Sequence, residues 1–137
     1  MGKYKRVLLK LSGEALAGVK KQGFDEATCT DIAKQVKLLV DSGVQVAVVI
    51  GGGNFWRGRS SENIDRVKAD QIGMLATIMN CVYASEIFRS AGLKTKVMTP
   101  YACGDISELL LKDSLNSLTL SFVKATLGVT SSPKKDK

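Results

Sequence analysis

The chain of 137 residues is the length of one domain, and it carries 20 Lys and Arg against 13 Asp and Glu, a formal net charge of +7. It has no histidine and three widely spaced cysteines, Cys29, Cys81 and Cys103, which excludes a Cys/His zinc site and indicates a reducing, cytoplasmic compartment. We expect neither a signal peptide nor a membrane span, because no apolar run is long enough. The basic balance suits phosphorylated ligands as well as nucleic acid.

The first third of the sequence predicts a strand–helix–strand unit. Its two strands are mostly apolar, and the second is too apolar to have one exposed face. Buried strands joined by a helix predict a parallel sheet covered by helices, and so an α/β fold. In chain order we expect a strand over 6–11, a turn at 12–14, a basic loop over 18–23, a helix from an N-cap at Asp25 to Ser42-Gly43, and a strand over 44–50.

The rest of the sequence predicts a long helix from Asp65 to Ala91, a strand from Thr95 to Met98 and a short helix from Asp105 to Leu115. The long helix is apolar on more than one side, which indicates burial against more than its own sheet and hence a subunit contact. The segment from Ser114 to Lys137 has no clear period and ends in Ser, Pro and Lys. We expect this tail to be poorly ordered.

Three consecutive glycines, Gly51, Gly52 and Gly53, follow the second strand directly. Backbone N–H groups in such a loop form a concave anion site, for which phosphate is a common ligand. The sequence fits neither the P-loop nor the dinucleotide-binding pattern, whose last glycine would fall on Trp56. A tight turn is the alternative, but three glycines exceed what a turn needs, so ligand contact is favoured.

Three charged residues are candidates for the same site. Lys10 either faces solvent in a half-exposed strand or serves a phosphate at the carboxyl end of a parallel strand. Arg57 is either a solvated loop residue or a bidentate anion clamp. Asp70 either interacts with a helix dipole or accepts a hydrogen bond from a ribose hydroxyl. Together with the glycine loop they indicate phosphoryl transfer, which depends on positioning and charge neutralisation and needs no histidine.

Three long blocks of this chain resemble bacterial uridylate (UMP) kinases, which have the amino-acid-kinase fold. Their order and spacing make the resemblance specific. The blocks are KRVLLKLSGEAL at 5–16, VVIGGGNFWRG at 48–58 and DRVKADQIGMLAT at 65–77. The resemblance implies a three-layer sandwich with a parallel sheet, and transfer of the ATP γ-phosphate to UMP to give UDP in pyrimidine nucleotide biosynthesis.

The resemblance also implies roles for single residues. Lys10 would be the catalytic residue and, with Ser12 and Gly13, would hold the ATP phosphates. Gly53 would lie on the ATP side and Arg57 would bind phosphate.

On the acceptor side, Gly52 would contact UMP and Asp70 its ribose. The family uses ATP with nucleotide-bound Mg²⁺, and no protein-held metal is expected. It assembles as a homo-hexamer activated by GTP; the long helix would form its dimer contact, and the loop over 18–23 lies where its GTP-responsive segment lies.

The resemblance covers residues 4–113 and stops before the tail over 114–137. We therefore expect the fold to be truncated to its N-terminal, nucleoside-monophosphate-side half, with impaired transfer. One alternative is a non-catalytic fragment that keeps a phosphate nest and an interface helix. The other is a small basic nucleic-acid-binding protein, which the absence of a basic stripe with interleaved aromatic residues disfavours.

Overall fold

The computed structural model describes residues 3–57, 63–109 and 126–130. Their strands form one sheet in the order β1-β2-β5-β3-β4. Because neighbours in the sheet are not always neighbours in sequence, the chain crosses over as an α/β fold requires. The strands are β1 (Arg6–Leu11), β2 (Gln45–Ile50), β3 (Lys94–Thr99), β4 (Glu108–Leu109) and β5 (Thr126–Thr130).

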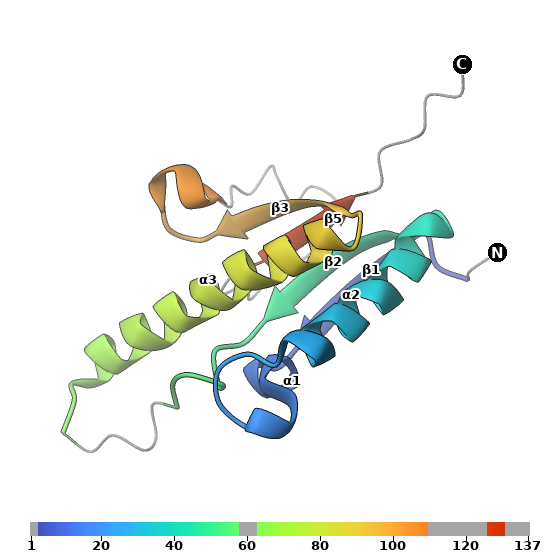
Figure 1. Ribbon diagram of the computed structural model, residues 1–137. Coiled ribbons are helices and arrows are strands. Elements are labelled where there is room, and N and C mark those ends of the chain that lie inside the picture. Colours follow the sequence, from blue (N-terminus) through green and yellow to red (C-terminus); the bar gives the residue numbers. More distant parts are fainter. Residues whose placement is uncertain (1–2, 58–62, 110–125, 131–137) are drawn as a thin grey trace.

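Strands β1 and β2 run parallel and in register, with Leu11 opposite Ile50 at their carboxyl ends. The N–H of Gly51 donates to the carbonyl of Leu11 at 3.0 Å, which extends the pairing one residue beyond the strands. In Figure 1 the carboxyl end of β2 points toward α1 (Gly13–Ala17). The two loops that follow β1 and β2 therefore leave the sheet at the same edge.

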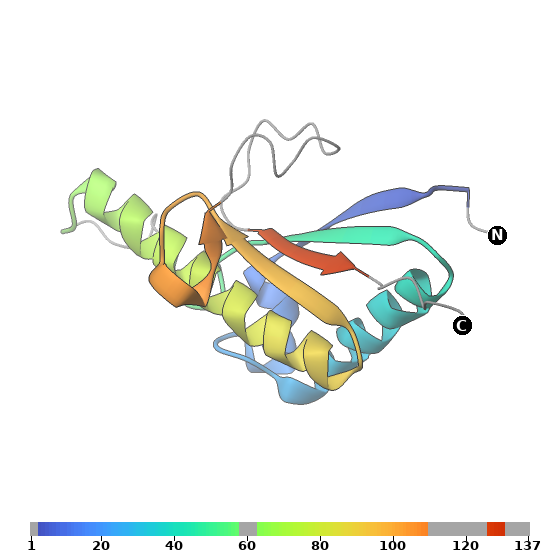
Figure 2. The ribbon, with the colours of Figure 1, turned by 90° about the horizontal axis from the view of Figure 1, so that it is seen from above.

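Two long helices cover one face of the sheet, as the view from above shows (Figure 2). They are α2 (Glu26–Asp41) and α3 (Arg66–Ser90). Asp25 caps α2 by accepting a hydrogen bond from the N–H of Thr28 at 3.2 Å, as the sequence predicts. The largest buried apolar side chains of this layer are Leu16, Val48, Ile50 and Phe88.

The sheet is not wholly parallel. Strand β5 pairs antiparallel with both β2 and β3, so that Gly128 lies between Ala47 and Lys96. The expectation of a parallel sheet is therefore wrong for β5, and five residues of the expected tail form a strand. The other tail residues lie outside the described part of the chain, as do residues 110–115 of the expected short helix.

Two local predictions also differ from the structure. The expected turn at 12–14 is the start of helix α1, and Ser12 is its N-cap, with the Ser12 hydroxyl accepting from the N–H of Ala15 at 3.2 Å. In place of a helix beginning at Asp105, a 3-10 turn at Gly104–Ile106 leads into β4. The hydroxyls of Ser107 and Thr99 lie 2.6 Å apart, and pairing with the free edge of β3 outweighs the local helix preference.

Replacing Phe88 tests the core directly. Its side chain is 1% exposed in the layer between α3 and the sheet. We expect Phe88→Ala to lower the free energy of unfolding by about 3–5 kcal/mol, because a large cavity replaces the ring. Leu38→Ala, at a residue that is 72% exposed on α2, should change it by less than about 0.5 kcal/mol. Equal urea midpoints for the two variants would contradict this placement of the core.

Candidate functional site

The loops after β1 and β2 touch each other through bare backbone at Gly13. A Cβ atom on Gly13 would lie 2.6 Å from the backbone nitrogen of Gly53 and 2.6 Å from Oδ1 of Asn54. Real Cβ atoms do not approach other atoms so closely, so only glycine allows this contact. Gly13 thus brings the start of α1 against the glycine loop.

The glycine loop lines a cavity of about 260 Å³ with the N-terminal part of α3. The lining residues are Gly51, Gly52, Gly53, Trp56, Ala69, Asp70, Gly73 and Thr77. The structure therefore brings Asp70 together with the glycine loop, although the two are far apart in sequence. Trp56 and Thr77 belong to the same wall, and the sequence alone assigns neither of them to the site.

Close packing explains part of the glycine requirement. A Cβ atom on Gly52 would lie 3.0 Å from the carbonyl oxygen of Gly73 and 3.1 Å from Oγ1 of Thr77, both on α3. One on Gly51 would meet only an ordinary contact at 3.6 Å. Gly52 must lack a side chain partly because α3 approaches it, a tertiary contact that the sequence does not reveal.

Lys10 is exposed near the end of β1, opposite Val49 in the register. The strand alternates between exposed and half-buried residues, and Leu9 and Leu11 pack against the core beneath the sheet. Lys10 thus lies on the face of the sheet away from α2 and α3. Both interpretations of Lys10 fit this position, since it faces solvent and also lies at the carboxyl end of a parallel strand.

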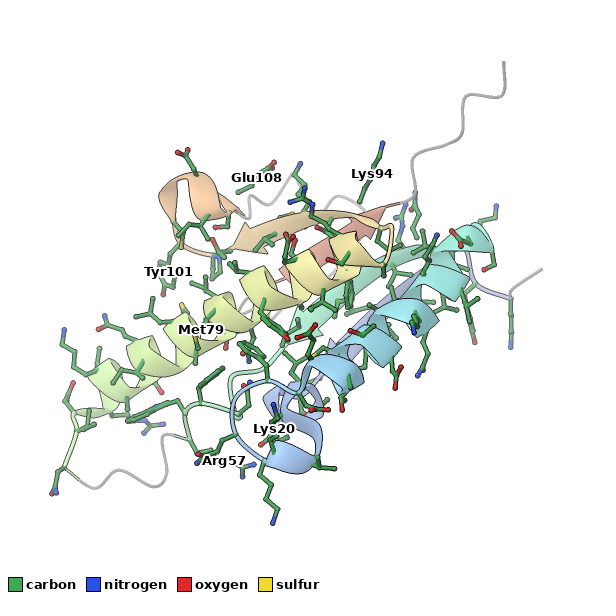
Figure 3. The ribbon with its side chains drawn as sticks, in the orientation of Figure 1. Lys20, Arg57, Met79, Lys94, Tyr101 and Glu108 are labelled. Carbon is green, nitrogen blue, oxygen red and sulfur yellow. The ribbon has the colours of Figure 1, made fainter. Side chains whose placement is uncertain are left out.

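Arg57 forms an ion pair with Glu14 across the two loops. Their side chains are 66% and 41% exposed, so the pair contributes little to stability. The carboxylate of Glu14 also lies where a Cβ atom on Gly53 would project. Arg57 thus neutralises an acidic group beside the glycine loop, and Figure 3 shows Arg57 at the α1 end of the molecule. The sequence does not indicate this pairing, because 43 positions separate the two residues.

Two buried amides fix the glycine loop from behind. Asn54 is 1% exposed and Asn80, in the middle of α3, is fully buried. Nδ2 of Asn80 donates to Oδ1 of Asn54 at 2.7 Å and to the carbonyl of Gly51 at 2.7 Å. The sequence alone assigns neither residue a role in the site, although a polar residue on the apolar side of α3 is a signal for Asn80.

Aromatic rings join the 18–24 segment to this region. Phe24 stacks on Tyr83 with ring centroids 3.7 Å apart, and it meets Phe55 edge-on at 5.1 Å. Burial raises the pKa of Tyr83 above its ordinary value. Hydrogen bonds from Thr28 lower the pKa of Asp25. Phe55 thus packs against the ring of Phe24 in this structure.

Cys29 and Cys81 are buried beneath the sheet, and neither is a good nucleophile near neutral pH. Burial raises the pKa of the Cys81 thiol to about 12 and also raises that of Cys29. Thiolates, not thiols, are the reactive species. Among the described residues no cluster of His, Cys, Asp and Glu could hold a metal ion, and no helix has the length and hydropathy to cross a membrane.

Comparison with known proteins places this geometry in a family. A model of the amino acid kinase family matches residues 5–127. The chain belongs to the amino acid kinase family. Over 114 residues it is 48% identical to a uridylate kinase of Bacteroides thetaiotaomicron, covering 82% of this chain and 48% of that protein.

Solved structures agree with this assignment. A UMP kinase from Bacillus anthracis superposes with a TM-score of 0.74 at 40% identity, over 79% of this chain and 46% of the other. A UMP kinase from Ureaplasma parvum gives 0.73 at 25% identity, over 82% and 50%. The chain therefore spans about half the length of the relatives it matches.

The comparisons confirm the resemblance that the three sequence blocks carry, and they confirm the α/β fold. The structure brings Gly13, Gly52, Gly53 and Asp70 to one edge of the sheet. The ligand roles of these residues remain predictions, and so does the domain boundary at residue 113.

Two glycine substitutions test whether close packing requires glycine at each position. We expect Gly13→Ala to destabilise the fold by about 1–3 kcal/mol, because its methyl group would overlap the backbone of the facing loop. Gly51→Ala should cost less than about 1 kcal/mol, since its methyl group meets only an ordinary contact. Urea denaturation of both variants measures the difference. A Gly51→Ala variant that is as unstable as Gly13→Ala would contradict the described loop contact.

Proposed function

We propose that this chain carries the acceptor-side site of a UMP kinase, which transfers the γ-phosphoryl group of ATP to UMP and yields UDP. One observation carries the proposal: the glycine loop and Asp70 line a single cavity at the carboxyl ends of β1 and β2. Open α/β sheets bind ligands at this edge. The 48% identity to a uridylate kinase supports this choice of substrate.

The acceptor site would hold the phosphate and ribose of UMP. The cavity of about 260 Å³ is slightly smaller than the roughly 300–1,000 Å³ typical of small-molecule pockets. It therefore suits part of a nucleotide better than a whole one. The backbone at Gly52 would contact the phosphate, and the Asp70 carboxylate would accept a hydrogen bond from a ribose hydroxyl.

The donor side would use residues around the end of β1. Lys10 supplies a mobile positive charge, while Ser12, Gly13 and Gly53 supply polar groups and uncovered backbone for the ATP phosphates. Arg57, once turned from Glu14, would add a second charge. Mg²⁺ carried on the ATP phosphates would neutralise charge in the transfer. No general base is needed, because the acceptor is itself a phosphate oxygen.

Oligomer formation, response to GTP and a cytoplasmic location are part of the same proposal. An apolar stripe on α3 is exposed, at 37–64% of each side chain. Residues spaced by three and four positions share one helix face. The stripe consists of Ile72, Leu75, Met79 and Val82, and Figure 3 marks Met79 on α3. We propose that this stripe forms the contact between subunits, as part of a homo-oligomer.

A second candidate function follows from length. Because the chain spans about half of its relatives, the acceptor site could exist without transfer. In that case the protein would bind UMP or phosphate and contact other subunits, but it would form no UDP.

Substitution of Lys10 tests the transfer. We expect Lys10→Ala to lower the rate of UDP formation by about 100- to 1,000-fold, because the charge on the transferring group loses its partner. Stability should be unchanged, since Lys10 is exposed. Lys34→Ala, which removes another exposed lysine on α2, is the matched control and should keep the wild-type rate. The assay couples UDP release to a spectroscopic signal.

The outcomes separate the two candidate functions. Equal rates for Lys10→Ala and Lys34→Ala would contradict the role of Lys10. Binding of UMP by the wild-type chain without UDP formation would support the binding function over the kinase.

A further inference from the structure

The two buried amides behind the glycine loop satisfy each other and their surroundings. Nδ2 of Asn54 donates to the carbonyl of Gly23 at 2.9 Å and to Oδ1 of Asn80 at 3.2 Å. Nδ2 of Asn80 donates to Asn54 and to the carbonyl of Gly51. All four amide N–H groups thus have acceptors. A buried polar network that is fully satisfied favours one arrangement strongly.

The pair sets the direction of one backbone N–H in the loop. The carbonyl of Gly51 points toward Asn80. In a trans peptide the carbonyl and the following N–H point in opposite directions. The described residues contain no cis peptide, so the N–H of Gly52 points away from Asn80. Loss of the Asn80 amide would free the peptide between Gly51 and Gly52 to rotate and would leave buried acceptors unpaired.

The same pair holds the 18–24 segment. Both backbone groups of Gly23 bond to Asn54: its carbonyl accepts from Nδ2, and its N–H donates to the Asn54 carbonyl at 3.1 Å. The next residue, Phe24, stacks on Tyr83 and meets Phe55 edge-on. Any rotation of Asn54 would therefore disturb the glycine loop and the 18–24 segment together.

We propose that Asn80 and Asn54 are positioning residues that align the glycine loop for phosphate and couple its ligand occupancy to the order of the 18–24 segment. The first half of this inference rests on the proposed function, since it takes the glycine loop to be the phosphate site. The second half concerns the segment and can be tested without any ligand.

The first experiment measures the segment by limited trypsin digestion. Lys20 and Lys21 are exposed in it, and cleavage after Lys34 in α2 reports global unfolding. We expect Asn80→Ala to raise the ratio of cleavage after Lys20 and Lys21 to cleavage after Lys34 by about tenfold, as the loss of buried hydrogen bonds implies. Asn80→Leu fills the same volume without the amide and should act alike if the alanine variant does not fold.

Ser85→Ala is the matched control. Ser85 also lies on α3, and its hydroxyl is 2.6 Å from that of Thr95, but it has no contact with the glycine loop among the described interactions. It should lose stability without changing the cleavage ratio. An unchanged ratio in both Asn80 variants, or an equal rise in Ser85→Ala, would overturn the proposal.

The second experiment measures UMP binding through the fluorescence of Trp56, the only tryptophan. We expect the Asn80 variants to bind UMP about tenfold more weakly and Ser85→Ala to bind it normally. In the wild type, UMP should slow cleavage after Lys20 and Lys21, because coupling is reciprocal. Unchanged affinity in the Asn80 variants would overturn the inference. No UMP binding by the wild type would count against the proposed function alone, and the cleavage ratio would then decide the inference.

Discussion

The parallel pairing of β1 and β2 is the constraint on which the rest of the structure depends. With Leu11 opposite Ile50, both strands end at the same level, and the loops that follow meet at once. The contact is possible because Gly13 has no side chain where the backbone of Gly53 passes. A shift of one residue in this register would also turn Val7, Leu9 and Leu11 of β1 away from the core. Register, core and site are therefore fixed by the same pairing.

Strand β5 has a different place in the architecture. It lies between β2 and β3, which do not pair with each other, and it joins the two parallel strand pairs into one sheet. Without it, β2 and β3 would each present an open edge, which favours association with other chains. A chain about half the length of its relatives thus still forms a continuous sheet on which the site is built.

The sequence predicts the periodic and local features well, because they follow from the spacing of apolar residues and from short-range hydrogen bonds. The Asp25 cap, the parallel pair of strands β1 and β2 and the glycine loop are of this kind. The expected burial of β1 is wrong, because its residues alternate between exposed and half-buried. It does not predict contacts that depend on tertiary approach: the Arg57–Glu14 pair spans 43 positions, and the partners of Asn80 lie 26 and 29 positions away in sequence. The helix predicted from Asp105 fails because pairing with β3 draws Glu108 into the sheet instead. Of the residues that line the cavity, the sequence singles out the three consecutive glycines and Asp70 but not the remaining residues of α3.

The central claim is that the loops after β1 and β2 form one phosphate site with Asp70. Backbone amide NMR during titration of the wild-type chain with UMP, and then with ATP, tests it most directly. The account predicts that the largest saturable shifts fall on Gly52 and Asp70 with UMP and on Gly13 and Gly53 with ATP, with α2 unchanged. Saturable shifts concentrated elsewhere, or none at these four residues, would contradict it.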